Sequence, residues 1–132
     1  MNENHKRILK NNFEHIEKEI EEIKLMLRNK KHDFVMYEIK QDVSEERKQE
    51  IYSVLKTIMN KISEIKHLLK LETETEYTSR SIRAMLNDIW ITLEESMPKG
   101  LKGYGSLNDN DKEFLIHQLS TIKENVKKIS EW

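Results

Sequence analysis

Glu64 and His67 have the spacing of two metal ligands on one helix face. Two residues separate them, and in helical bundles that bind two metal ions a Glu-x-x-His motif directs both side chains toward one ion. Such a centre also needs a second motif, but His15 and His117 each follow a glutamate at another spacing. We therefore interpret Glu64 and His67 as a surface pair flanking Ile65, and we expect neither a bound metal nor any other cofactor.

A second pair, Arg28 and His32, lies one helical turn apart in a basic segment. The pair resembles the arginine–histidine motif of HEPN-type ribonucleases, which are helical bundles, although only three residues intervene here and that family has a longer spacer. The resemblance implies a nucleic-acid-processing protein in which His32 handles protons, Arg28 steadies phosphate charge, and Lys30 and Lys31 contact phosphates. We favour the alternative that the segment is a basic helix C-terminus whose charges complement the helix dipole.

The sequence indicates no catalytic group elsewhere. Arg80 and Arg83 could form an anion-binding fork, but we expect them to be solvated or to pair with nearby glutamates. The chain contains no G-x-S-x-G motif and no cysteine, and its many acidic residues are typical of the solvated faces of amphipathic helices. We therefore expect no enzyme activity.

The charges are numerous but balanced. The chain has 23 basic and 24 acidic residues and a formal net charge of −1, so composition makes a nucleic-acid partner unlikely. Cysteine is absent, which removes disulfides and zinc–thiolate sites and fits a reducing compartment. With no apolar signal segment and no run of about 18 apolar residues, we expect a cytoplasmic protein without a membrane span. The Lys-, Ile-, Asn- and Glu-rich composition suggests a prokaryotic source.

Three segments carry apolar residues at alternating intervals of three and four, which is the spacing of one face of an amphipathic helix. They cover residues 9–27, 51–69 and 115–129, and a further helical segment, 77–97, has intervals of three to five. Short connections between similar helices favour antiparallel neighbours. We therefore predict an all-α fold, an up-down-up-down antiparallel four-helix bundle, as a single domain over residues 1–132.

The helix starts carry recognisable capping residues. Ser44 precedes two glutamates and is a good N-cap with an acidic first turn, and residues 108–111 offer the same for the fourth helix. Thr73-x-x-Glu76 is a capping-box pattern that predicts the start of the third helix.

Residues 31–43 leave two alternatives open. Phe34 and Tyr37 keep phase with Leu27, which favours a continuation of the first helix. Alternatively, the segment is an irregular crossing that turns its aromatic side chains inward. We favour the continuation.

The stretch from Pro98 to Gly105 contains the only proline and all three glycines. Proline has no N–H for a helical ladder and disfavours the α conformation at the preceding residue, so we expect the third helix to stop there. Leu101 and Tyr104 would then plug the end of the bundle. The alternative is that the glycine N–H groups, with Lys99 and Lys102, bind an anion. We favour the cap.

The function that the sequence favours is a non-enzymatic helical interaction module of the adaptor, regulator, immunity or antitoxin type, acting by protein–protein contact. Apolar side chains beyond those that a single bundle seam needs favour a protein partner, and a homodimer is one form of it. The candidate contact residues are Met26, Met59, Trp90, Leu101 and Tyr104.

Overall fold

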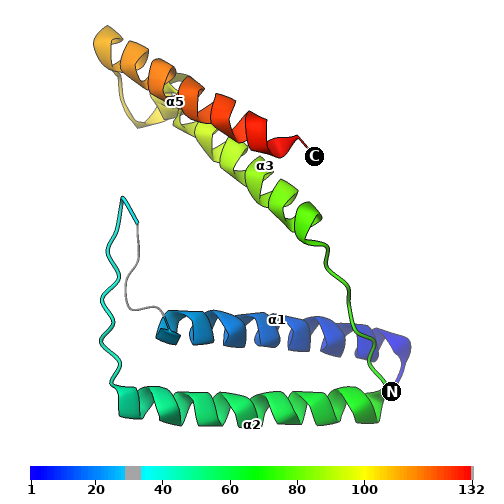
Figure 1. Cartoon of the computed structure of the whole chain (residues 1–132). Coiled ribbons are helices and arrows are strands. Elements are labelled where there is room, and N and C mark those ends of the chain that lie inside the picture. The colour runs from blue at the N-terminus through cyan, green and yellow to red at the C-terminus, as the bar shows by residue number, and fades with distance from the viewer. Residues whose placement is uncertain (29–33, 132) are drawn as a thin grey trace. The chain divides into compact units, whose positions relative to one another are not determined.

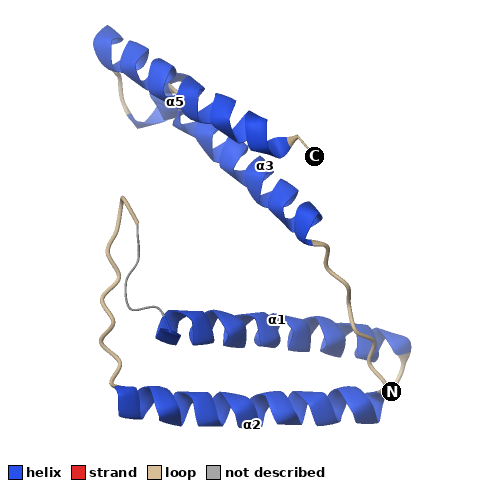
Figure 2. Ribbon diagram, viewed as in Figure 1, coloured by secondary structure: helices blue, strands red, loops and turns tan. Residues whose placement is uncertain are grey.

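The computed structural model describes residues 1–28 and 34–131, and every regular element within these ranges is a helix (Figures 1 and 2). The predicted all-α class is therefore confirmed. The chain divides into two compact units, Met1–Thr73 and Glu74–Trp132. The helices, listed in chain order, are α1 (Glu3–Arg28), α2 (Glu45–Leu69), α3 (Thr78–Ser96), α4 (Pro98–Leu101), the 3-10 helix η1 (Lys102–Tyr104) and α5 (Asp109–Ser130).

The first unit is a hairpin of two long helices. In Figure 1, α1 and α2 lie side by side and run in opposite directions. The predicted N-cap of α2 is confirmed, because the Ser44 hydroxyl accepts the Arg47 N–H at 3.1 Å. At the other end of α2, Lys70 has a left-handed backbone and its N–H returns to the carbonyl of His67, which ends the helix.

The predicted continuation of the first helix is wrong, because α1 ends at Arg28 and residues 34–44 are not helical. Residues 29–33, on which part of that prediction falls, lie outside the described residues. The Gln41 side-chain amide donates to the carbonyl of Met26 at 3.0 Å, so this residue satisfies one of the carbonyls that a helix end leaves open. The rings of Phe34 and Tyr37 stack on each other with centroids 4.0 Å apart, and both remain exposed.

The core of this hairpin is narrow. Ile20 and Leu27 on α1 and Leu55 on α2 are its buried apolar side chains. Lys48, in the first turn of α2, is also buried, and its ammonium lies 3.1 Å from a carboxylate oxygen of Glu45. The long lysine stem thus packs with the apolar residues while its charge meets a carboxylate at the edge.

The second unit is a hairpin of α3 and α5, which lie side by side in opposite directions with α4 and η1 between them in the chain (Figure 1). Leu86 and Val126 are its buried apolar residues. The predicted start of the last helix is confirmed, since the side-chain oxygen of Asn108 accepts the Asp111 N–H at 2.8 Å.

The predicted capping box for the third helix is wrong. Helix α3 begins at Thr78, and its N-cap residue Tyr77 makes no side-chain capping hydrogen bond. The hydroxyl of Thr73 instead accepts a hydrogen bond from the ammonium of Lys66. An interaction with α2 therefore replaces the local one on which the motif depends.

The proline and glycine stretch stops α3 as predicted, but it is not a plugged cap. Helix α3 ends at Ser96, and Pro98 then occupies the first turn of α4, where its missing N–H costs nothing. Leu101 is partly buried, whereas Tyr104 is 91% exposed and plugs nothing. Gly105 alone among the three glycines has a positive φ, of 134°, and a Cβ at Gly100 would overlap the backbone carbonyl of Glu95.

Candidate functional site

Each helix of the first hairpin has an apolar face that only partly meets its neighbour. Leu27 and Leu55 are buried between the two helices, but Ile16, Ile23 and Ile58 from the same apolar repeats are each more than one-third exposed. At about 100° per residue, the exposed isoleucines lie roughly 20–60° around the helix axis from the buried residues. The apolar repeat is therefore wider than one neighbouring helix can cover.

The exposed isoleucines of α1 and α2 lie on the same side of the hairpin. On a helical wheel viewed from the N-terminus of each helix, the exposed isoleucines lie at lower angles than the buried residues that face the neighbouring helix. This holds for both α1 and α2. The helices run in opposite directions, so the same rotation on each brings the residues to one common side. We call this side open face 1; it comprises Ile16, Ile23, Ile58 and the partly buried Ile65.

The second hairpin repeats this arrangement. Leu86 of α3 and Val126 of α5 are buried, and the exposed apolar residues of both helices are again rotated in the same sense from them. They form a second one-sided surface, open face 2, which comprises Ile82, Ile89, Ile122 and Ile129. Two helices alone therefore do not bury the apolar repeat in either unit.

Uncharged polar residues border open face 2. Thr92 and Ser96 on α3 donate their hydroxyl hydrogens to backbone carbonyls one turn earlier, at 2.9 and 2.8 Å. On α5, Thr121 and the Asn125 amide do the same at 3.1 and 3.0 Å. These donors already form hydrogen bonds within their own helices, so covering them with another surface would cost little desolvation free energy. Depletion of charge is also characteristic of the centres of protein interfaces.

The predicted contact residues are divided between the two units. Met59 is partly buried on the side of α2 that faces α1, and Met26 on α1 is 61% exposed. In the second unit, Trp90 is partly buried on α3, and the ammonium of Lys123 on α5 lies 4.7 Å from its ring centroid. Leu101 is partly buried, so Met26 and Tyr104 are the two that project most into solvent.

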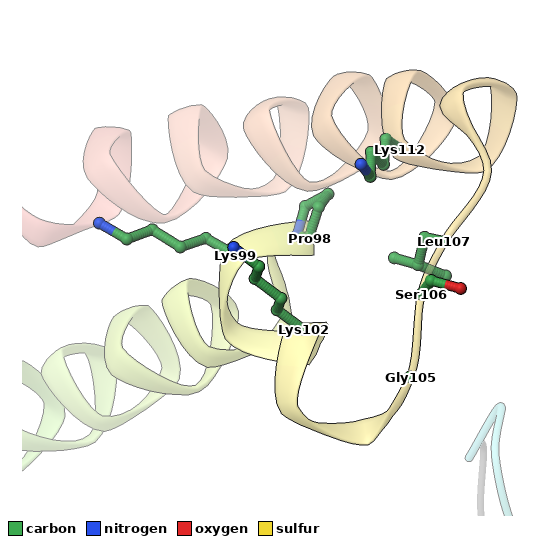
Figure 3. A pocket seen from close by; sticks show the side chains of 7 residues that line it. All are labelled: Pro98, Lys99, Lys102, Gly105, Ser106, Leu107 and Lys112. Atoms are coloured by element: carbon green, nitrogen blue, oxygen red, sulfur yellow. The ribbon is translucent and has the colours of Figure 1, made fainter.

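A pocket of about 360 Å³ lies in the second unit where α4, η1 and the start of α5 meet (Figure 3). Figure 3 shows Lys112 on the α5 wall, Lys99 and Lys102 on the wall formed by the short helices, and Ser106 on the connecting loop. Sequence reasoning found Lys99 and Lys102 but missed Lys112 and Ser106. The N-cap at Asn108 could have indicated Lys112, because a helix that begins there has Lys112 in its first turns, next to the preceding loop.

The other candidates for chemistry are surface groups. A carboxylate oxygen of Glu64 lies 3.3 Å from the ammonium of Lys61, and His67 is exposed. The Arg28 side chain donates to its own helix at the Lys24 carbonyl, and the predicted partner His32 lies outside the described residues. Arg83 likewise donates to the backbone of Ser79. Within residues 1–28 and 34–131, no three histidine or acidic side chains are grouped as metal ligands would be.

No protein-family model, no curated protein and no solved structure matches the chain. Within the described ranges, no helix is both long enough and apolar enough to cross a bilayer. The candidate surfaces therefore rest on the geometry of the chain itself.

Proposed function

We propose that the protein is a non-enzymatic module that acts by helix-mediated contact with other protein surfaces. The observation that carries this proposal is the exposure of large side chains outside the two open faces, among them Met26 at 61% and Tyr104 at 91%. Exposed apolar residues beyond those that a helical core needs are typical of surfaces that meet another protein.

The finer architecture that we propose is the up-down-up-down antiparallel four-helix bundle, as one domain over residues 1–132. Both hairpins present isoleucines at heptad spacing, which is the pattern of helices that pack at about 20° in such bundles. In this arrangement open faces 1 and 2 form the core, and the isoleucines that the hairpins expose become buried. The sequence periodicity and the one-sided exposure of the same isoleucines both support this arrangement.

Because the bundle core uses both open faces, the proposed contact with a partner is made by apolar side chains outside them. Met26 and Tyr104 are the strongest of the predicted contact residues, since each is more than half exposed. Flexible methionine side chains and amphipathic tyrosine rings are both enriched at protein interfaces. The proposed partner is a protein, and a second copy of this chain is the form that can be tested without another component.

Sedimentation equilibrium from about 5 to 100 μM tests the self-association. We expect a reversible dimer with a dissociation constant in the micromolar range, which corresponds to about 8 kcal/mol of association free energy. Met26→Ser and Tyr104→Ser should each shift the equilibrium toward monomer. Met36→Ser and Tyr77→Ser are matched controls, because these residues are also exposed but were not assigned to the contact. A strict monomer at about 100 μM would reject the homodimer.

A further inference from the structure

The pocket between α4, η1 and α5 differs in charge from the unit that contains it. Residues 74–132 hold eight basic and ten acidic side chains, yet three of the eight, Lys99, Lys102 and Lys112, line this one pocket and no acidic residue does. Asp109 and Asp111 precede Lys112 in the chain but do not contribute to the lining. The pocket is therefore a local concentration of positive charge in an acidic unit.

None of the three lysines forms an ion pair with another described residue. Most of the described lysines that pair do so with a glutamate three or four positions away on the same helix. Glu95 stands four positions before Lys99 and Asp109 three positions before Lys112, yet neither forms an ion pair with that lysine, and Lys102 has no acid at these distances. Their positive charges are consequently available to a ligand. In Figure 3 the three side chains point in different directions.

We propose that this pocket binds a multiply charged phosphate anion. Ammonium groups from three separate segments can each approach a different phosphate oxygen, which suits a polyphosphate better than a single carboxylate. Ser106 on the loop also lines the pocket, and Pro98 and Leu107 supply an apolar wall. The volume of about 360 Å³ falls within the range of small-molecule pockets.

The conformation of residues 98–105 leaves the pocket open. Tyr104 is 91% exposed, so its ring does not fill the space. Gly105, whose positive φ directs the chain from η1 into the loop, is itself part of the lining and has no side chain to obstruct the entrance. The same eight residues that stop α3 thus shape the pocket and supply two of its lysines.

The experiment is a thermal melt of the full chain with sodium tripolyphosphate at about 5 mM, with sodium chloride at equal ionic strength as the reference. We expect tripolyphosphate to raise the melting temperature by binding to the folded state. Each of Lys99→Gln, Lys102→Gln and Lys112→Gln should weaken binding by about tenfold, as loss of one charged hydrogen bond does. Asp111→Asn, which removes a nearby negative charge, should strengthen it.

Lys127→Gln and Lys128→Gln are the matched controls, because they make the same charge change in the last turn of α5. The proposal is overturned if tripolyphosphate gives no stabilisation beyond sodium chloride, or if the control variants lose the effect as much as the pocket variants. Backbone amide chemical shifts of the unaltered chain give a second measurement that needs no variant. Shifts centred on Gly105, Ser106 and Leu107 support the site, and shifts centred elsewhere overturn it.

A parallel titration with ATP in the absence of divalent cations distinguishes free polyphosphate from a nucleotide. Tighter binding of ATP that is lost in Leu107→Ala would assign the apolar wall to the base or sugar. Equal binding of ATP and tripolyphosphate would assign the site to the phosphate chain alone. In both cases Lys99→Gln, Lys102→Gln and Lys112→Gln should weaken binding, and unchanged binding in these variants would overturn the proposal.

Discussion

The ammonium of Lys123 on α5 lies 4.7 Å from the centroid of the Trp90 ring on α3. The same ammonium pairs with the carboxylate of Glu94, one turn further along α3. A cation above an indole face is attracted by the ring quadrupole, and the partial burial of Lys123 strengthens the attraction. This contact links the two helices of the second hairpin at the residue that was expected to bind a partner.

We predict that Trp90 and Lys123 are energetically coupled. A double-mutant cycle with Trp90→Leu and Lys123→Met should give a coupling free energy of about 0.5–1 kcal/mol from chemical denaturation. Lys127→Met with Trp90→Leu is the control and should show no coupling. Additive effects in the Lys123 cycle would show that Trp90 is held by apolar packing alone.

Leu55 is the side chain of α2 whose truncation we expect to cost most. It is 7% exposed, and Leu68 on the same helix is 76% exposed. Leu55→Ala should lower the free energy of unfolding by about 2–5 kcal/mol through lost burial and a cavity. Leu68→Ala is the same chemical change at an exposed position and should stay within about 0.5 kcal/mol. Similar values at the two positions would place the core of the first hairpin elsewhere.

We predict opposite effects on stability when Gly100 and Gly103, in one short segment, are each replaced by alanine. A Cβ at Gly100 would overlap the backbone of Glu95, whereas nothing lies within 4 Å of a Cβ at Gly103. Gly100→Ala should therefore destabilise the protein by about 1–3 kcal/mol, as overpacking does. Gly103→Ala should be neutral or slightly stabilising, because alanine restricts the unfolded chain. Thermal denaturation of both variants tests this, and equal tolerance would mean that α4 separates from the end of α3.

The sequence predicted the long helices well because their signals are local. The Ser44 and Asn108 caps and the stop before Pro98 all depend on hydrogen bonds or steric effects within a few residues. Sequence-based prediction failed where a more distant residue forms a hydrogen bond. The Gln41 amide donates to a carbonyl at the end of α1 from 15 positions away, and the ammonium of Lys66 donates to the hydroxyl of Thr73. Neither interaction has a signature in apolar spacing.

The candidate site was only partly predictable for the same reason. Lys99 and Lys102 stand beside conspicuous glycines, so the sequence drew attention to them, whereas Lys112 joins them only through the turn between η1 and α5. Lys48 was missed because a charged residue carries no apolar signal, although its stem is buried and its ammonium meets Glu45. The apolar repeats gave the residues of the open faces but not how much of each face one neighbouring helix covers.

Ile89 and Ile91 provide the most direct test of the claim that the open faces are covered by helices. Their exposures are 45% and 47%, so within the hairpin alone Ile→Ala should cost about the same at both positions. Ile89 lies on open face 2, and Ile91 lies on the opposite side of α3. We measure the free energy of unfolding of Ile89→Ala and Ile91→Ala by urea denaturation at low protein concentration. The bundle predicts about 2–5 kcal/mol of destabilisation for Ile89→Ala and less than about 1 kcal/mol for Ile91→Ala, and equal small losses at both positions would contradict it.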